Sequence, residues 1–249
     1  MIAQLRCELL KQRTTRTTRA LLLWMIVLIV LIVLLHSFGL SASTLRVAGN
    51  QPKVYGWGTS IGALFAALLG ALSITSEIRT GTIRPTLLVT PNRTLVIGAK
   101  VIAAAAGGVG VGLVAEALIA VIASAAFAIR GIPVALTAGG FAQMLAGGAA
   151  AAALWAAIGT GVGAIVRSQV GAVVGLCVWL LLIASVLVGE VPSAGRFTPG
   201  SSAGALAGML QSAGSLKLVT PAVGGLLLIA YAAVAAAAGA FTTERRDLG

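Results

Sequence analysis

Six long apolar runs, each with few charged residues, dominate this sequence. We place them at residues 20–39, 56–75, 101–128, 138–165, 169–189 and 220–241. A helix needs about 20 apolar residues to cross the hydrocarbon layer of a membrane. Inside that layer the backbone must hydrogen-bond to itself, which leaves helices or closed barrels. Because the runs lack the strict alternation of a barrel strand, the sequence predicts an all-α membrane protein, a bundle of six transmembrane helices.

The small share of charged residues excludes a water-soluble domain. Only 9% of the 249 residues are charged, whereas soluble domains carry about 25%. The net charge of +11 is typical of proteins that bind nucleic acids. However, the basic residues lie almost entirely between the apolar runs and lack interleaved aromatic residues. We therefore expect the lipid bilayer, and no nucleic acid, as the surroundings of this chain.

The distribution of basic residues predicts the orientation, because cytoplasmic loops are enriched in lysine and arginine. With the N-terminus inside, the outer side holds only Arg46, Lys53, Arg130, Arg196 and Lys217. All other lysines and arginines then lie inside. This even number of spans places both termini, including the tail 242–249, in the cytoplasm. Arginines outnumber lysines, and alanine, glycine and valine abound, which indicates a GC-rich bacterial genome. We therefore expect the bacterial cytoplasmic membrane as the location.

Residues 1–19 precede the first run, which is too long for the apolar part of a cleaved signal peptide. Ile2, Leu5 and Leu9 recur at helical spacing, with most basic residues off that stripe. This pattern predicts an amphipathic helix at the cytoplasmic interface. A disordered basic tail that only sets the orientation is the alternative.

Small residues recur four apart, as they do where membrane helices pack closely. The pairs are Gly108/Gly112, Gly159/Gly163, Gly171/Gly175 and Gly204/Gly208. They predict tight helix contacts, although a glycine-rich chain also contains such pairs by chance.

Glu116 is the clearest ionisable residue inside an apolar run. Charge at that depth is costly and often marks function. Glu116 is therefore a candidate substrate or proton site. The alternative is a position near the outer interface, or a structural pairing with a polar neighbour.

The sequence carries no recognisable catalytic arrangement. It has a single histidine, no G-x-S-x-G motif and no paired intramembrane carboxylates. It also has no G-x-x-x-x-G-K-[ST] motif for binding ATP. We expect a chain that is not an enzyme and holds no cofactor or metal.

The segment 76–100, between the second and third runs, is the most distinctive. Its charged residues, glycine and prolines follow an ordered pattern that indicates short helical pieces shaped for a partner. The residues of interest are Glu77, Arg79, Gly81, Thr82, Arg84, Leu87, Leu88, Pro91, Arg93 and Lys100. This pattern resembles the first cytoplasmic loop of the permease subunits of ABC-2-type ABC transporters, which reads E-x-x-x-G-T, an apolar pair, P-x-(S)-R and a lysine. Asn92 here replaces the common serine.

The resemblance implies a single transmembrane domain whose loop 76–100 couples it to ATP hydrolysis. In that family two permeases associate, as identical or homologous copies, and each docks a cytosolic ATPase that binds ATP and Mg²⁺. The loop residues Glu77, Arg79, Gly81, Thr82, Arg84, Pro91 and Arg93 would then contact the ATPase. The family also carries short re-entrant helices in the outer loop, here 190–219, where Thr198-Pro199-Gly200 resembles its Leu-Pro-Gly segment.

Two other functions stay open from the sequence. An ion- or proton-coupled secondary transporter would use Glu116, and it predicts more intramembrane ionisable residues and a repeated pattern of broken helices. A structural membrane protein would need neither. The exporter predicted by the resemblance would move a hydrophobic or amphipathic substrate by alternating access.

Overall fold

The computed structural model describes the chain except residues 1, 84, 86–87, 89–91, 210–217 and 246–249. The described residues form helices and no strands. Six helical segments are long and apolar enough to cross a membrane, as the sequence predicts. They are Arg16–Gly39, Ala48–Thr80, Thr94–Ile129, Ala138–Val166, Gln169–Glu190 and Pro221–Thr243.

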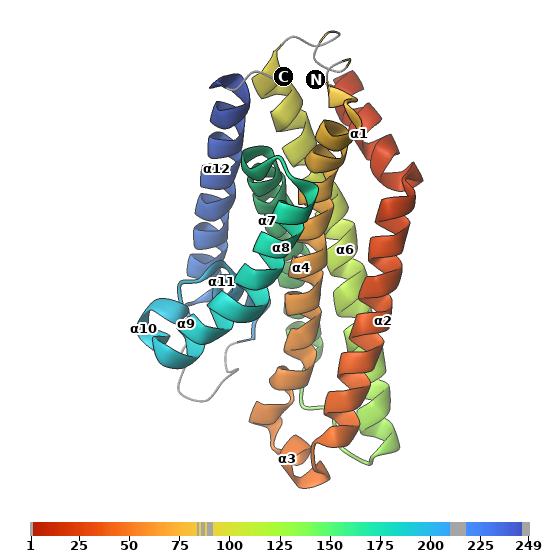
Figure 1. The fold of residues 1–249 in the computed structure, drawn as a ribbon. Helices are drawn as coiled ribbons and strands as arrows, with labels where there is room; N and C mark the ends of the chain where they lie inside the picture. Colours follow the sequence, from red (N-terminus) through yellow and green to blue (C-terminus); the bar gives the residue numbers. More distant parts are fainter. Residues whose placement is uncertain (1, 84, 86–87, 89–91, 210–217, 246–249) are drawn as a thin grey trace.

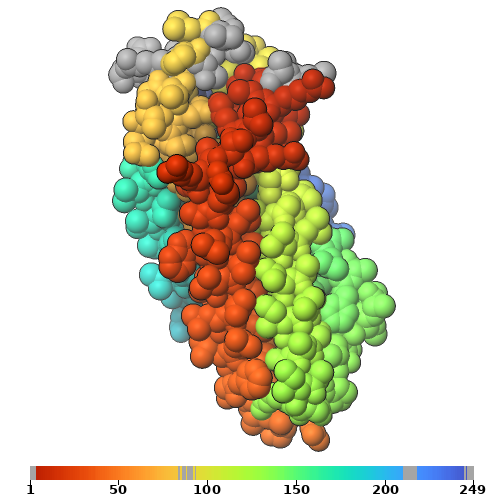
Figure 2. All heavy atoms as spheres, turned by 90° about the vertical axis from the view of Figure 1, so that its right-hand side faces the viewer, coloured from red at the N-terminus to blue at the C-terminus, as the bar shows by residue number. Residues whose placement is uncertain are grey.

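Two central helices form the core of the bundle. They are α4 (Pro52–Thr80) and α7 (Ala138–Val166), most of whose residues are buried. Around them lie α2 (Arg16–Gly39), α6 (Arg93–Ile129), α8 (Gln169–Cys177) and α12 (Pro221–Arg245). Figure 2 shows α2 and α6 side by side along one face. The exposed side chains of α2 and α12 are largely apolar, as expected of helices that face lipid.

Glycines let the backbones of the central helices touch. Gly159 of α7 lies against the Ala67 carbonyl of α4, and Gly163 lies against Ala71. Gly108 and Gly112 of α6 lie against α7 at Ala152 and Ala149. Close approach of this kind is the main source of helix association in lipid, where burial of apolar surface gains little. The prediction of tight contacts is therefore confirmed for these two glycine pairs.

The other two predicted glycine pairs have different roles. Gly175 of α8 has open space where a side chain would lie, so it brings no helix close. Gly208 has a φ of 79° and follows α11 (Pro199–Leu206), where its left-handed backbone ends the helix. Spacing alone did not separate these glycines from those at the core, because it does not indicate which face a helix turns inward.

The segment after α8 folds back alongside the bundle. It comprises η2 (Val178–Ile183), α9 (Ala184–Glu190), α10 (Pro192–Gly195) and α11. Figure 1 shows α10 and α11 level with the middle of α4, well away from the end that carries α3 (Ala42–Arg46). The Leu206 carbonyl at the end of α11 packs against Gly147, well inside α7. This part of the chain therefore lies within the depth of the bundle.

A buried glutamine stabilises the end of the bundle that carries α3 through hydrogen bonds. Gln51, next to η1 (Ala48–Asn50), is 1% exposed. Its amide nitrogen donates to the carbonyls of Leu45 and Pro133, at 3.1 and 2.8 Å, and its oxygen accepts from Ala135 N–H at 2.8 Å. One side chain thus joins α3 to the loop between α6 and α7, which is far from it in the sequence.

The connection between α4 and α6 is shorter than the predicted loop 76–100. Helix α4 continues to Thr80 and ends at Gly81, which has a φ of 73°. Helix α6 begins after Asn92, whose side chain accepts from Leu95 N–H. Glu77 and Lys100 therefore lie on helices, where the contacts described below neutralise their charges.

We expect Gly159→Ala to destabilise the bundle, because the added methyl would collide with the Ala67 carbonyl. The expected loss is about 1–3 kcal/mol. Gly175→Ala is the matched control, since it has free space and gains up to about 1 kcal/mol of helix propensity. Thermal unfolding of the detergent-solubilised protein, followed by tryptophan fluorescence, measures both. Equal stability of the two variants would contradict the assigned contact.

Candidate functional site

Four charged side chains meet near the end of the bundle that carries both termini (Figure 1). Glu8 and Lys11 come from α1 (Ile2–Thr14), Glu77 from α4 and Lys100 from α6. The Lys100 ammonium lies 2.9 Å from Glu8 and 2.8 Å from Glu77. The Lys11 ammonium lies 2.9 Å from Glu8 and 2.8 Å from Glu77. We call these four residues the charged cluster.

The charged cluster is buried and electrically balanced. The Lys100 side chain is fully buried, and those of Glu8 and Glu77 are 4% and 10% exposed. Only Lys11 reaches the surface. Burial lowers the pKa of Lys11, but its hydrogen bonds to Glu77 and Glu8, together with their charges, outweigh this and raise the pKa above its usual value. Two cations facing two carboxylates offset the desolvation that a single buried charge would suffer.

The charged cluster holds α1 against the bundle. Gln4 donates to Glu8 at 3.3 Å, and the side chain of Gln12 packs beside Gly107 of α6. The inward face of α1 is therefore largely polar, although Leu5 and Leu9 are half-buried beside it. The side chain of Ile2 lies outside the described part.

The predicted partner-contacting residues fall into two groups. Arg79, Gly81 and Thr82 are exposed at the end of α4, whereas Glu77 is enclosed in the charged cluster. Arg84 and Pro91 lie outside the described residues, as does the side chain of Arg93.

Two apolar residues show how the connection sits on the bundle. Ile83 is 4% exposed and packs with Ile74, Ile97 and Ala164. Leu88 is 84% exposed, so its apolar side chain projects away from the bundle. The connection is thus anchored at its start and presents an exposed leucine beyond it.

Glu116 lies on α6, fully buried between α4 and α7. Thr59 of α4 donates a hydrogen bond of 2.6 Å to its Oε1 atom. Its Oε2 atom has no hydrogen-bond partner among the described residues. The alternative of a structural pairing thus accounts for one carboxyl oxygen and leaves the other without a partner.

Two glycines make the space that Glu116 occupies. A methyl group on Gly58 of α4 would meet Oε2, and one on Gly148 of α7 would meet Oε1. The carboxyl group therefore fills a gap that larger residues on either neighbouring helix would close. Sequence reasoning identified Glu116 but not these neighbours, because they come from two other helices.

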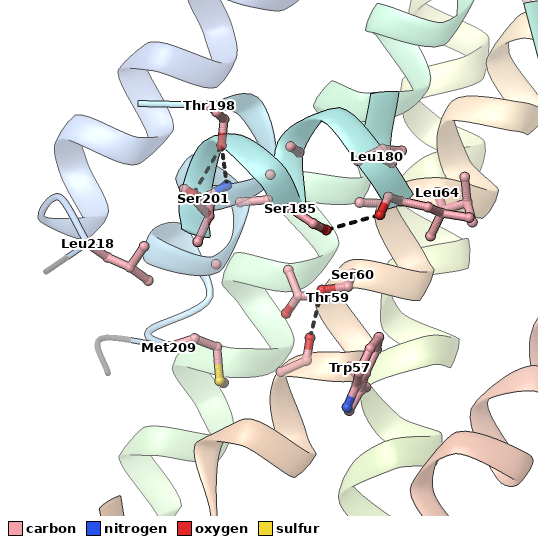
Figure 3. Close-up of a pocket in the computed structure, with 18 of the residues that line it drawn as sticks. Trp57, Thr59, Ser60, Leu64, Leu180, Ser185, Thr198, Ser201, Met209 and Leu218 are labelled. Atoms are coloured by element: carbon pink, nitrogen blue, oxygen red, sulfur yellow. Dashed lines mark hydrogen bonds between the residues drawn. The ribbon is translucent and has the colours of Figure 1, made fainter. Parts of the chain in front are cut away.

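A cavity of about 480 Å³ lies beside Thr59. Its walls come from α4, from η2 and α9, and from α11 (Figure 3). Most of the lining is apolar, and five hydroxyl-bearing residues lie among it, namely Thr59, Ser60, Ser185, Thr198 and Ser201. Ser60 donates to the Gly56 carbonyl, Ser185 donates to the Leu181 carbonyl, and Thr198 donates to Ser201. Sequence reasoning missed this cavity, since three separate segments enclose it.

The described residues contain no group of three histidine, cysteine, aspartate or glutamate side chains that could hold a metal ion. No protein-family model matches the chain, and no curated protein sequence matches it either. The resemblance to ABC-2 permeases thus stays a prediction from the residues of segment 76–100.

We expect Lys100→Ala to destabilise the protein by about 3 kcal/mol, because Glu8 and Glu77 keep only the half-exposed Lys11 as a counter-ion. Arg79→Ala, which removes an exposed cation from the same end, is the control. The double variant Glu77→Gln, Lys100→Gln removes one charge of each sign and should lose less than Lys100→Ala. Thermal unfolding measures all three, and equal losses for Lys100→Ala and Arg79→Ala would refute a stabilising cluster.

Proposed function

We propose that this chain is the permease subunit of an ATP-driven exporter of the ABC-2 type. It moves a hydrophobic or amphipathic substrate across the bacterial cytoplasmic membrane by alternating access. The observation that carries the proposal is the connection between α4 and α6. Its exposed Gly81, Thr82 and Leu88 belong to the family pattern. It lies at the same end of the bundle as the start of α1 and the end of α12.

The residues around this connection are placed to transmit force from it to the helices of the bundle. Ile83 packs against α4, α6 and α7. The charged cluster joins α1, α4 and α6 a short way along the bundle. A force on the connection therefore reaches three helices together. A rigid coupling of this kind is what a two-state transporter needs, because ATP must bias one arrangement of helices over another.

The energy source lies in a separate chain. The sequence has no P-loop, so ATP and Mg²⁺ bind two cytosolic ATPase subunits, one on each of two associated permeases. The permease itself is not an enzyme and contributes the pathway. Arg79, Gly81, Thr82 and Leu88 are its described contact residues for the ATPase.

The orientation follows from the basic residues. Both termini and the connection face the cytoplasm, and α1 lies at the cytoplasmic interface of the membrane. Leu10 and Arg6 of α1 are both exposed, and one apolar and one basic side chain suit such a position.

Co-purification from the native host tests the proposed partner. A tag after Gly249 should recover a P-loop ATPase, identified by mass spectrometry. Leu88→Asp should abolish that recovery, because it places a charge on the exposed contact without disturbing the core. Val47→Asp, an exposed apolar residue at the opposite end of the bundle, should leave recovery unchanged. A stable preparation without an ATPase would contradict the proposal that this chain belongs to an ATP-driven exporter.

Cys7 tests the orientation, because it is exposed on α1. In a Cys177→Ser background, a membrane-impermeant maleimide should label inside-out vesicles and leave intact spheroplasts unlabelled. Labelling of intact spheroplasts would place the N-terminus outside and contradict the proposed topology. A cysteine at the exposed Lys53, in a variant lacking Cys7, should show the reverse pattern.

A further inference from the structure

Glu116 is a buried acid without a counter-ion. It is fully buried, and in the described part of the chain no lysine, arginine or histidine forms an ion pair with it. Thr59 donates to Oε1, and Oε2 has no hydrogen-bond partner among the residues that the structure describes. Burying a carboxyl in this way is costly. Because Gly58 and Gly148 leave room for the acid, the surrounding helices are shaped around it.

Thr59 connects this acid with the cavity. Its hydroxyl donates to Glu116 at 2.6 Å, and the same residue lines the cavity wall. A ligand in the cavity is therefore one side chain away from the carboxyl group. Rotation of Thr59 about its first side-chain torsion is the smallest movement that opens this path, since staggered rotamers of threonine interconvert without backbone change.

The cavity suits the apolar part of a small molecule. Its volume of about 480 Å³ lies within the usual range for ligand pockets. Leu64, Leu180, Met209 and Leu218 supply apolar walls, and the hydroxyl groups of the lining are already hydrogen-bonded within the protein. A ligand thus gains from burying hydrocarbon there, and the carboxyl group of Glu116 lies behind Thr59.

We propose that this cavity binds an amphipathic amine. Its apolar body fills the space between α4, η2 and α11, and its protonated nitrogen takes the place of the Thr59 hydroxyl as the hydrogen-bond donor to Glu116. A cation brought to a buried carboxylate forms a charge-assisted hydrogen bond, which is stronger than a neutral one. An anionic ligand has no such hydrogen bond to offer.

Lys53 does not change this preference. It is exposed at the rim of the cavity. It lies roughly 9 Å along α4 from Thr59, at 1.5 Å per residue. Its long, flexible side chain lets the exposed ammonium reach solvent. Glu116 lies behind Thr59, outside the residues that line the cavity.

The proposed export function is needed only to call this ligand a substrate, and the binding proposal itself does not depend on it. Binding itself needs no ATPase, so it can be measured on the purified chain in phosphatidylcholine nanodiscs. The probe is a dansyl fluorophore with a pentylamine arm, and its N-acetylated form is the neutral counterpart of nearly equal shape. If the amine does not bind, the proposed export function is unaffected. If no ATPase co-purifies, the binding proposal is unaffected.

Glu116→Gln should weaken binding of the amine at least about tenfold, because the ligand loses its ion pair. It should leave binding of the acetylated probe within about twofold. Glu190→Gln, which removes an exposed acid at the end of α9, is the matched control and should change neither. Ala184→Phe, which fills the cavity, should weaken both probes.

Three results would overturn the proposal. The first is equal binding of amine and acetylated probe by the wild type. The second is a Glu116→Gln variant that binds the amine as tightly as the wild type does. The third is loss of both probes in Glu116→Gln, which would make the acid structural. Thermal unfolding of each variant shows whether it is folded. Thr59→Val is a second test, since it should weaken binding of the amine less than Glu116→Gln does.

Discussion

Backbone contact between α7 and its neighbours is the interaction on which the rest of this structure depends. Lipid offers helices little reason to associate by burying apolar surface, so they must gain from close packing instead. Gly159 brings α7 against α4, Gly112 brings α6 against α7, and Gly161 brings α12 against α7. The resulting closeness of α4, α6 and α7 places Thr59 beside Glu116 and leaves a fitted space for its carboxyl group.

The two sets of buried acids differ in how their charge is compensated. Glu8 and Glu77 each face two lysines, so their desolvation is offset within the protein. Glu116 has one hydroxyl partner and no cation among the described residues. A balanced group stabilises the contact between helices, whereas an unbalanced one favours a ligand that completes it. This difference separates the charged cluster, which holds helices together, from Glu116, for which we propose a binding role beside the cavity.

Helix α4 links these two regions. It is continuous from Pro52 to Thr80, and it carries both Thr59 and Glu77. These residues are roughly 27 Å apart along the helix axis, at 1.5 Å per residue. In the proposed exporter, a force applied to the connection after α4 passes through the charged cluster into this helix and reaches the wall of the cavity. Because most of α4 is buried against its neighbours, its movement also displaces them.

The sequence by itself determined the six membrane-crossing helices, because hydropathy is a local property that sums over about twenty residues of one segment. For the same reason it showed Glu116 as an acid within an apolar run. Only the tertiary structure decided that Glu8 and Lys100, 92 residues apart, would form an ion pair. It also decided that Gly159 would pack and Gly175 would not, and that three segments would enclose a cavity. These features depend on which face each helix turns toward its neighbours, and that choice is made by the packing of the whole bundle.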